Sequence, residues 1–86
     1  MKKVLVVDDE PSIVTLLTFN LEKEGYKVIS ADDGQIGLEL ALEQSFDFII
    51  LDVMLPSIDG IAITQKLRQE KIDTPILILT AKDDQV

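Results

Sequence analysis

Two short runs of apolar residues in this sequence each end in acidic residues. The run from Phe48 to Leu51 is followed directly by Asp52, and the run from Val4 to Val7 is followed by Asp8 and Asp9. A continuous apolar run bounded by polar residues is typical of a strand buried on both faces, as in a parallel sheet. We therefore predict two central strands whose acids stand at their carboxyl ends, where open α/β sheets bind ligands.

Helical periodicity follows each of the first two strands. One helix is predicted from Pro11 to Glu24, ended by Gly25, with an inner face made of Ile13, Val14, Leu16, Leu17 and Leu21. A second helix is predicted from the turn at 32–34, where an Asp can cap it, to about Gln44. Its expected inner face consists of Ile36, Leu40, Ala41 and Leu42.

The remaining segments complete an alternating order of strands and helices. Lys27–Ala31 is a less uniformly apolar strand that suits a sheet edge, and Ile76–Leu79 is a strand that is apolar throughout. Between them a third helix is predicted from about Ile61 to Glu70, with Ile63 and Leu67 inward. The order βαβαβαβ favours an α/β fold, a parallel sheet with helices on both faces, formed by residues 1–86 as one domain.

Composition and charge narrow the function. The 86 residues carry 16 acids against 8 bases, a net charge of −8, which argues against binding of nucleic acid by this chain alone and against anionic membranes. No apolar run is long enough for a membrane span or a signal peptide, so a cytoplasmic location is expected. Cysteine is absent, which excludes disulfides and thiolate metal sites.

The acids at the two strand ends predict a metal site. Carboxylates on neighbouring strands, roughly 5 Å apart, repel by about 3 kcal/mol per pair at an effective dielectric near 20. A bound cation removes that cost, and a sequence without His or Cys supplies only oxygen ligands. These suit Mg²⁺ or Mn²⁺ rather than zinc. The alternative is that Asp8, Asp9 and Asp52 are ordinary helix caps and solvated loop acids.

Three segments together carry a family resemblance: VLVVDDEP at Val4–Pro11, FIILDVMLPSIDG at Phe48–Gly60 and PILILTA at Pro75–Ala81. At these spacings the chain resembles the receiver domain of bacterial two-component response regulators, and most of all the OmpR-type transcriptional regulators. The resemblance covers essentially the whole chain and implies a flavodoxin-like fold. It implies a signalling phosphoacceptor that assists its own phosphorylation and is not a turnover enzyme.

The resemblance also assigns roles to individual residues. Asp52 would accept a phosphoryl group from a phosphohistidine of a sensor histidine kinase. Asp9 would bind Mg²⁺ directly together with Asp52, the backbone carbonyl of Met54 would be a third protein ligand, and Asp8 would act through water. Thr80 would contact the phosphoryl group and report phosphorylation to the far face.

The sequence departs from the family at its end. Receivers have five strands in the order 2-1-3-4-5, and the fifth carries a Lys that pairs with the phosphoryl group. The sequence stops before the last helix, strand and helix and before a DNA-binding output domain, so we expect a shortened receiver.

An apolar strand at 76–79 without a neighbour predicts self-association, as a dimer or an oligomer with exchanged segments. Two other functions stay open. One is a non-catalytic, self-associating interaction module that is not phosphorylated. The other is a flavodoxin-like cofactor binder, which the loop acids disfavour because they repel a phosphate.

Overall fold

The computed structural model of the chain describes residues 2–55 and 57–79. Strands and helices alternate along them in the predicted order, and each predicted boundary lies within one residue of the observed one. The elements are β1 (Lys3–Val7), α1 (Pro11–Lys23), β2 (Lys27–Ala31), α2 (Gly34–Glu43), β3 (Phe48–Asp52), α3 (Gly60–Gln69) and β4 (Ile76–Leu79).

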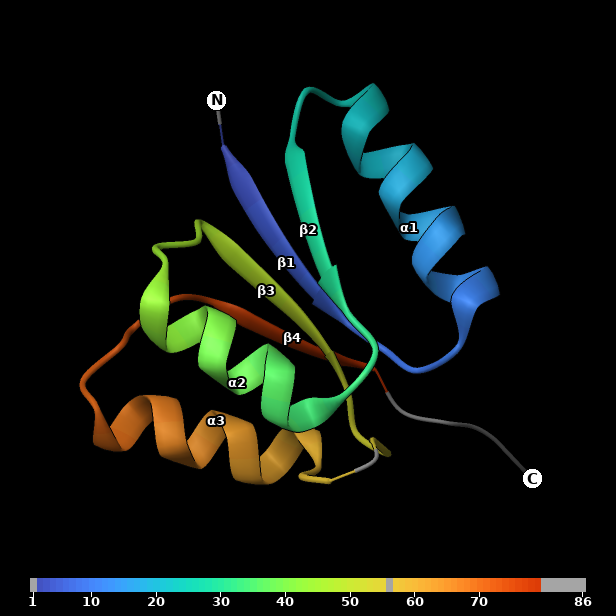
Figure 1. The fold of residues 1–86 in the computed structure, drawn as a ribbon. Coiled ribbons are helices and arrows are strands. Elements are labelled where there is room, and N and C mark those ends of the chain that lie inside the picture. The colour runs from blue at the N-terminus through green and yellow to red at the C-terminus, as the bar shows by residue number, and fades with distance from the viewer. Residues whose placement is uncertain (1, 56, 80–86) are drawn as a thin grey trace.

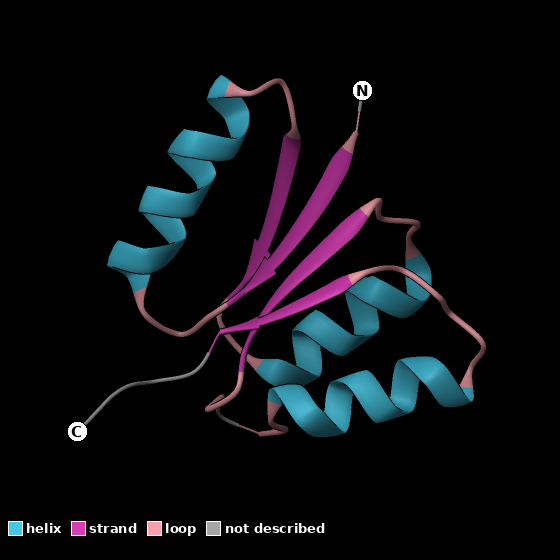
Figure 2. Ribbon diagram, turned by 180° about the vertical axis from the view of Figure 1, so that it is seen from behind, coloured by secondary structure: helices cyan, strands magenta, loops and turns pink. Residues whose placement is uncertain are grey.

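The strands form one parallel sheet in the order β2-β1-β3-β4. β1 and β3 are its central strands and β2 is an edge, as the apolar patterns predict. Helix α1 covers one face of the sheet, and α2 and α3 lie side by side on the other (Figure 1; Figure 2). The expected α/β fold with helices on both faces is confirmed.

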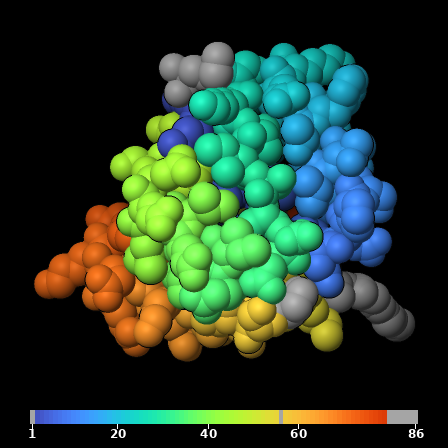
Figure 3. Space-filling model, viewed as in Figure 1, coloured from blue at the N-terminus to red at the C-terminus, as the bar shows by residue number. Residues whose placement is uncertain are grey.

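The core has a part on each face of the sheet, because alternate residues of a strand point to opposite faces. The larger part joins the sheet to α2 and α3, which Figure 3 shows packed against each other, and it includes Leu5, Val7, Ile49, Leu51, Ile63 and Leu67. The smaller part lies under α1 and contains Val4, Val6 and Ile50. Every residue from Val4 to Val7 is completely buried, which fixes the end of β1 firmly in place.

The predicted inner face of α2 is partly wrong. Ile36 and Leu42 are exposed, while the buried positions of this helix are Gly34, Gly37, Leu38 and Ala41. A Cβ atom added at Gly37 would lie 2.7 Å from the methyl carbons of Val7. The helix therefore turns its small residues toward the sheet to approach it closely, and this rotation carries Ile36 and Leu42 outward.

The predicted inner face of α1 contains one error of the same kind. Val14, Leu17 and Leu21 pack on the core beneath this helix, but Leu16 is 58% exposed. Leu16 is two residues from Val14, about 200° around a helix of 3.6 residues per turn, and so faces solvent. Gly25 ends the helix as predicted, with φ of 94°.

Candidate metal centre

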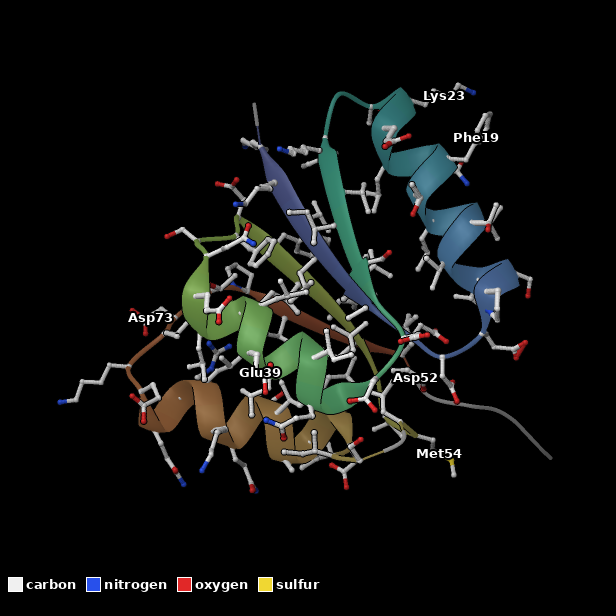
Figure 4. The ribbon with its side chains drawn as sticks, viewed as in Figure 1. Phe19, Lys23, Glu39, Asp52, Met54 and Asp73 are labelled. Atoms are coloured by element: carbon white, nitrogen blue, oxygen red, sulfur yellow. The ribbon has the colours of Figure 1, made fainter. Side chains whose placement is uncertain are left out.

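Adjacent central strands bring the three predicted acids together. Val7 of β1 pairs with Leu51 of β3, so the residues that follow them, Asp8 and Asp52, emerge side by side at the carboxyl edge of the sheet. Asp8, Asp9 and Asp52 each offer a carboxylate oxygen, and these oxygens all lie within 4.8 Å of one another. The predicted convergence of these carboxylates is confirmed, and Figure 4 shows Asp52 at the end of its strand.

Asp8 is the most constrained of the three. Its side chain is only 3% exposed, one carboxylate oxygen accepts a hydrogen bond of 2.9 Å from the backbone N–H of Glu10, and its own N–H donates to the carbonyl of Ala31 at 3.1 Å. Burial raises the pKa of the Asp8 carboxyl above its ordinary value of 3.8. The hydrogen bond from Glu10 opposes that rise, and the charges of Asp52 and Asp9 add to it.

The three carboxylates fit a hard divalent cation. At a separation of 4.8 Å each pair repels by about 3 kcal/mol at an effective dielectric of 20, before screening by solvent. One carboxylate is buried, one is half-buried and one is exposed, so the cluster can hold an ion that keeps some of its water. The donor set is all oxygen, which favours Mg²⁺ or Mn²⁺.

The segment after Asp52 folds back over the acid. The backbone N–H of Met54 donates to a carboxylate oxygen of Asp52 at 3.2 Å, and the N–H of Val53 donates to Leu79 at 3.0 Å. A Cβ atom added at Gly60 would lie 2.6 Å from the carbonyl oxygen of Asp52, so α3 begins directly against the end of β3. The metal role of the Met54 carbonyl stays a prediction.

The roles predicted for Thr80 and for Met54 concern the same edge of the sheet. Thr80, the predicted phosphoryl contact, lies outside the described residues. The side chain of Met54 is 66% exposed and points away from the sheet, which leaves its backbone as the part of the residue that can serve the site (Figure 4).

Sequence reasoning missed one contact at this edge of the sheet. The hydroxyl of Ser57 donates to a carboxylate oxygen of Asp33 at 2.6 Å, joining the segment after β3 to the start of α2. The two residues are 24 positions apart, so no local pattern reveals the pair. Asp33 also caps α2, which the turn at 32–34 does predict.

Open space adjoins the acids on the β2 side. A cavity of about 460 Å³ is bounded by Asp8, Asp9, Pro11, Val14, Thr15, Ser30, Ala31, Asp32 and Ile36. Two of the three clustered carboxylates, those of Asp8 and Asp9, therefore border this cavity.

Comparisons with known proteins place this arrangement in a family. The family model described as response regulator receiver domain matches residues 4–86. Over 84 residues the chain is 58% identical to the alkaline phosphatase synthesis transcriptional regulatory protein PhoP of Bacillus subtilis. That match covers 98% of this chain and 35% of PhoP, so the chain spans about a third of the length of this curated relative.

Solved structures give the same result. A Francisella response regulator receiver domain superposes with a TM-score of 0.91 at 36% identity, covering 99% of this chain and 70% of that one. The response regulator TrrA of Thermotoga maritima, crystallised with Mg²⁺ and BeF, gives 0.88 at 41% identity, covering 94% and 70%. TrrA in complex with the histidine kinase ThkA gives 0.86 at 41% identity, covering 94% and 70%. No helix in the described part of the chain is long and apolar enough to cross a membrane.

Proposed function

The chain belongs to the response regulator receiver family, and on that premise we propose that it is a Mg²⁺-dependent phosphoacceptor in two-component signalling. Asp52 takes a phosphoryl group from a phosphohistidine of a sensor histidine kinase in the cytoplasm. The phosphorylated domain then controls the transcriptional output of a longer regulator. The single observation that carries the proposal is the convergence of the Asp8, Asp9 and Asp52 carboxylates.

The geometry supports a defined role for each acid. A carboxylate oxygen of Asp52 attacks the phosphorus atom, the P–N bond to the imidazole breaks, and an acyl phosphate forms on Asp52. Mg²⁺ held by these residues would supply positive charge that offsets the negative charge on the phosphoryl oxygens. Asp9 and Asp52 would hold the cation with the carbonyl of Met54, while Asp8, which is buried, would act through water. In this reaction Asp52 is itself the group that is modified, so the proposed role is that of a signalling module rather than a turnover enzyme.

Two of the related structures support the choice of ligand and partner. TrrA, 41% identical, was crystallised with Mg²⁺ and BeF, and also with the histidine kinase ThkA. We extend both to this chain as proposals. Thr80 directly follows Leu79, the residue that pairs with Asp52 across the sheet, and this position in the sequence supports its assignment as the phosphoryl contact.

Intact-mass measurement tests the proposal. The chain is incubated with Mg²⁺ and phosphoramidate, and Asp52→Ala and Asp73→Ala are treated in parallel. Asp73 is the matched control, because it is an exposed acid at the opposite end of the sheet (Figure 4). One added phosphoryl group is expected on the wild type and on Asp73→Ala, and none on Asp52→Ala or in EDTA. An adduct on Asp52→Ala contradicts the assignment.

One observation favours a second candidate, a module that associates with copies of itself. In the described part of the chain β4 pairs with β3 on one side only, and Leu77, on the same face as α1, is 49% exposed. We propose that β4 pairs edge to edge with β4 of a second copy, which buries Leu77. Light scattering should show a dimer that Leu77→Lys disrupts, while Leu42→Lys, at an exposed α2 position, does not. A wild-type monomer at high concentration contradicts the proposal.

A further inference from the structure

Described residues of the segment between Asp52 and Gly60 make hydrogen bonds at its start, in its middle and at its end. At its start, Met54 donates to the carboxylate of Asp52. At its end, the N–H of Gly60 donates to the carbonyl of Val53 at 3.2 Å, which closes the segment into a loop. In its middle, the hydroxyl of Ser57 donates to Asp33, the N-cap residue of α2. The position of the loop backbone therefore depends on α2 as well as on β3.

The two carboxylate oxygens of Asp33 accept hydrogen bonds from different segments. One oxygen accepts from the backbone N–H groups of Gln35 and Ile36, at 2.7 and 3.3 Å, and so caps α2. The other accepts from the hydroxyl of Ser57. The cap itself needs only the first oxygen, since Ser, with a single side-chain oxygen, caps a helix about as well as Asp does. The second oxygen has no part in the helix and serves the loop alone.

Two backbone features show that the loop is held closely at this contact. Ser57 has φ of 72°, a conformation that glycine adopts freely and other residues adopt rarely. Next to it, the carbonyl of Ile58 lies so near Gly34 that a Cβ atom there would overlap its oxygen. A left-handed non-glycine residue persists where its surroundings determine it, and here the surroundings are the first turn of α2.

We propose that Ser57 is a positioning residue of the metal site. Its hydrogen bond to Asp33 holds the loop against α2, so that the carbonyl of Met54, three residues earlier, stays within reach of a cation bound by Asp9 and Asp52. The inference rests on the proposed Mg²⁺ function. It adds a residue that neither binds the ion nor touches the phosphoryl group, and it makes ion affinity depend on the start of α2. Partners behind a metal ligand typically change metal affinity by 10- to 100-fold when they are removed.

The test measures the dissociation constant for Mg²⁺ by isothermal titration, with urea unfolding measured in parallel. Ser57→Gly removes the hydroxyl and accepts positive φ without strain, whereas Ser57→Ala removes it and keeps the strain. Ser57→Asn restores a donor on a residue that tolerates this conformation. Asp33→Ser keeps the helix cap but lacks the second oxygen. Ser45→Ala, at an exposed serine outside the loop, is the matched control.

Ser57→Gly, Ser57→Ala and Asp33→Ser should each weaken Mg²⁺ binding by about tenfold. The double variant with Ser57→Ala and Asp33→Ser should bind Mg²⁺ no more weakly than either single variant, since both substitutions remove the same hydrogen bond. Ser57→Asn and Ser45→Ala should bind within twofold of the wild type. If the wild type binds Mg²⁺ and all variants bind it with the same dissociation constant, even where their urea midpoints differ, the proposed role of Ser57 is wrong. That result would leave the proposed metal site uncontradicted. If the wild type itself does not bind, the metal site and the role of Ser57 are both wrong.

Discussion

Replacing Asp52 with Asn should stabilise the metal-free protein. The change removes one charge from a cluster whose carboxylate oxygens lie within 4.8 Å, and so removes two repulsive pairs, each worth about 3 kcal/mol at an effective dielectric of 20. Asp9 is exposed and Asp52 is half-buried, so solvent and salt screen much of this energy. We expect a net gain of about 1 kcal/mol in the free energy of unfolding, or about 4–8 °C in Tm for a domain of this size.

Mg²⁺ should reverse the order of stability of the wild type and Asp52→Asn. A ligand at 100 times its dissociation constant stabilises the folded state by about 2.7 kcal/mol. The wild type should gain this stabilisation, and Asp52→Asn should lose most of it with one of its ligands. In Mg²⁺ the wild type is then the more stable protein, whereas in EDTA it is the less stable one.

Urea unfolding followed by circular dichroism, in EDTA and in saturating Mg²⁺, measures both differences. Asp73→Asn removes the same charge far from the cluster and controls for the net charge of −8. Its stability in EDTA should stay close to that of the wild type, and its gain in Mg²⁺ should equal the wild-type gain. The reasoning is refuted if Asp52→Asn is less stable than the wild type in EDTA, or if Asp73→Asn gives the same increase as Asp52→Asn.

Three further predictions follow from packing and from the Asp33 contact. Gly37→Ala should lower the free energy of unfolding by about 1–3 kcal/mol, because its Cβ would lie 2.7 Å from methyl carbons of Val7 in β1. The better helix propensity of Ala offsets up to about 1 kcal/mol of this loss. Urea unfolding measures the net change. Leu67→Ala, at a completely buried position, should lower the free energy of unfolding by about 2–5 kcal/mol. Leu16→Ala, at a position that is 58% exposed, should change it by about 0.5 kcal/mol or less. Equal losses for the two variants in urea unfolding would contradict the burial assigned to these residues. The hydrogen bond from Ser57 lowers the pKa of Asp33 below 3.8. Asp33 therefore contributes stability that is present above pH 3.8 and is lost as the pH falls through the lowered pKa. Carboxyl-carbon NMR should show the pKa of Asp33 rising toward 3.8 in Ser57→Gly and unchanged in Ser45→Ala.

The sequence predicts most of this fold because its patterns are local. The apolar run ending at Asp52 indicates a buried strand, and two such runs with acids at their ends are enough to predict that these carboxylates meet at one edge of a parallel sheet. The rotation of a helix is less local. Ile36 and Leu42 are apolar, but they are six residues apart and lie about 120° from each other around the helix. Gly37 decides which side of α2 meets the sheet, because only a glycine allows that approach to Val7.

Contacts between distant loops are the part that sequence reasoning does not reach. Ser57 and Asp33 are ordinary turn and cap residues when each is considered with its neighbours alone. Their hydrogen bond exists because β1 pairs with both β2 and β3, which brings the loops that follow β2 and β3 to one edge of the sheet. The prediction of this bond requires the register of the strands, which the apolar pattern alone does not supply.

The most direct test of the metal site is the position of a bound ion. Crystals of the chain grown with Mn²⁺, which scatters anomalously, should show one anomalous peak within bonding distance of carboxylate oxygens of Asp9 and Asp52 and of the carbonyl oxygen of Met54. A crystal saturated with Mn²⁺ that shows no peak among these three residues, or a peak only at other acids, contradicts the account.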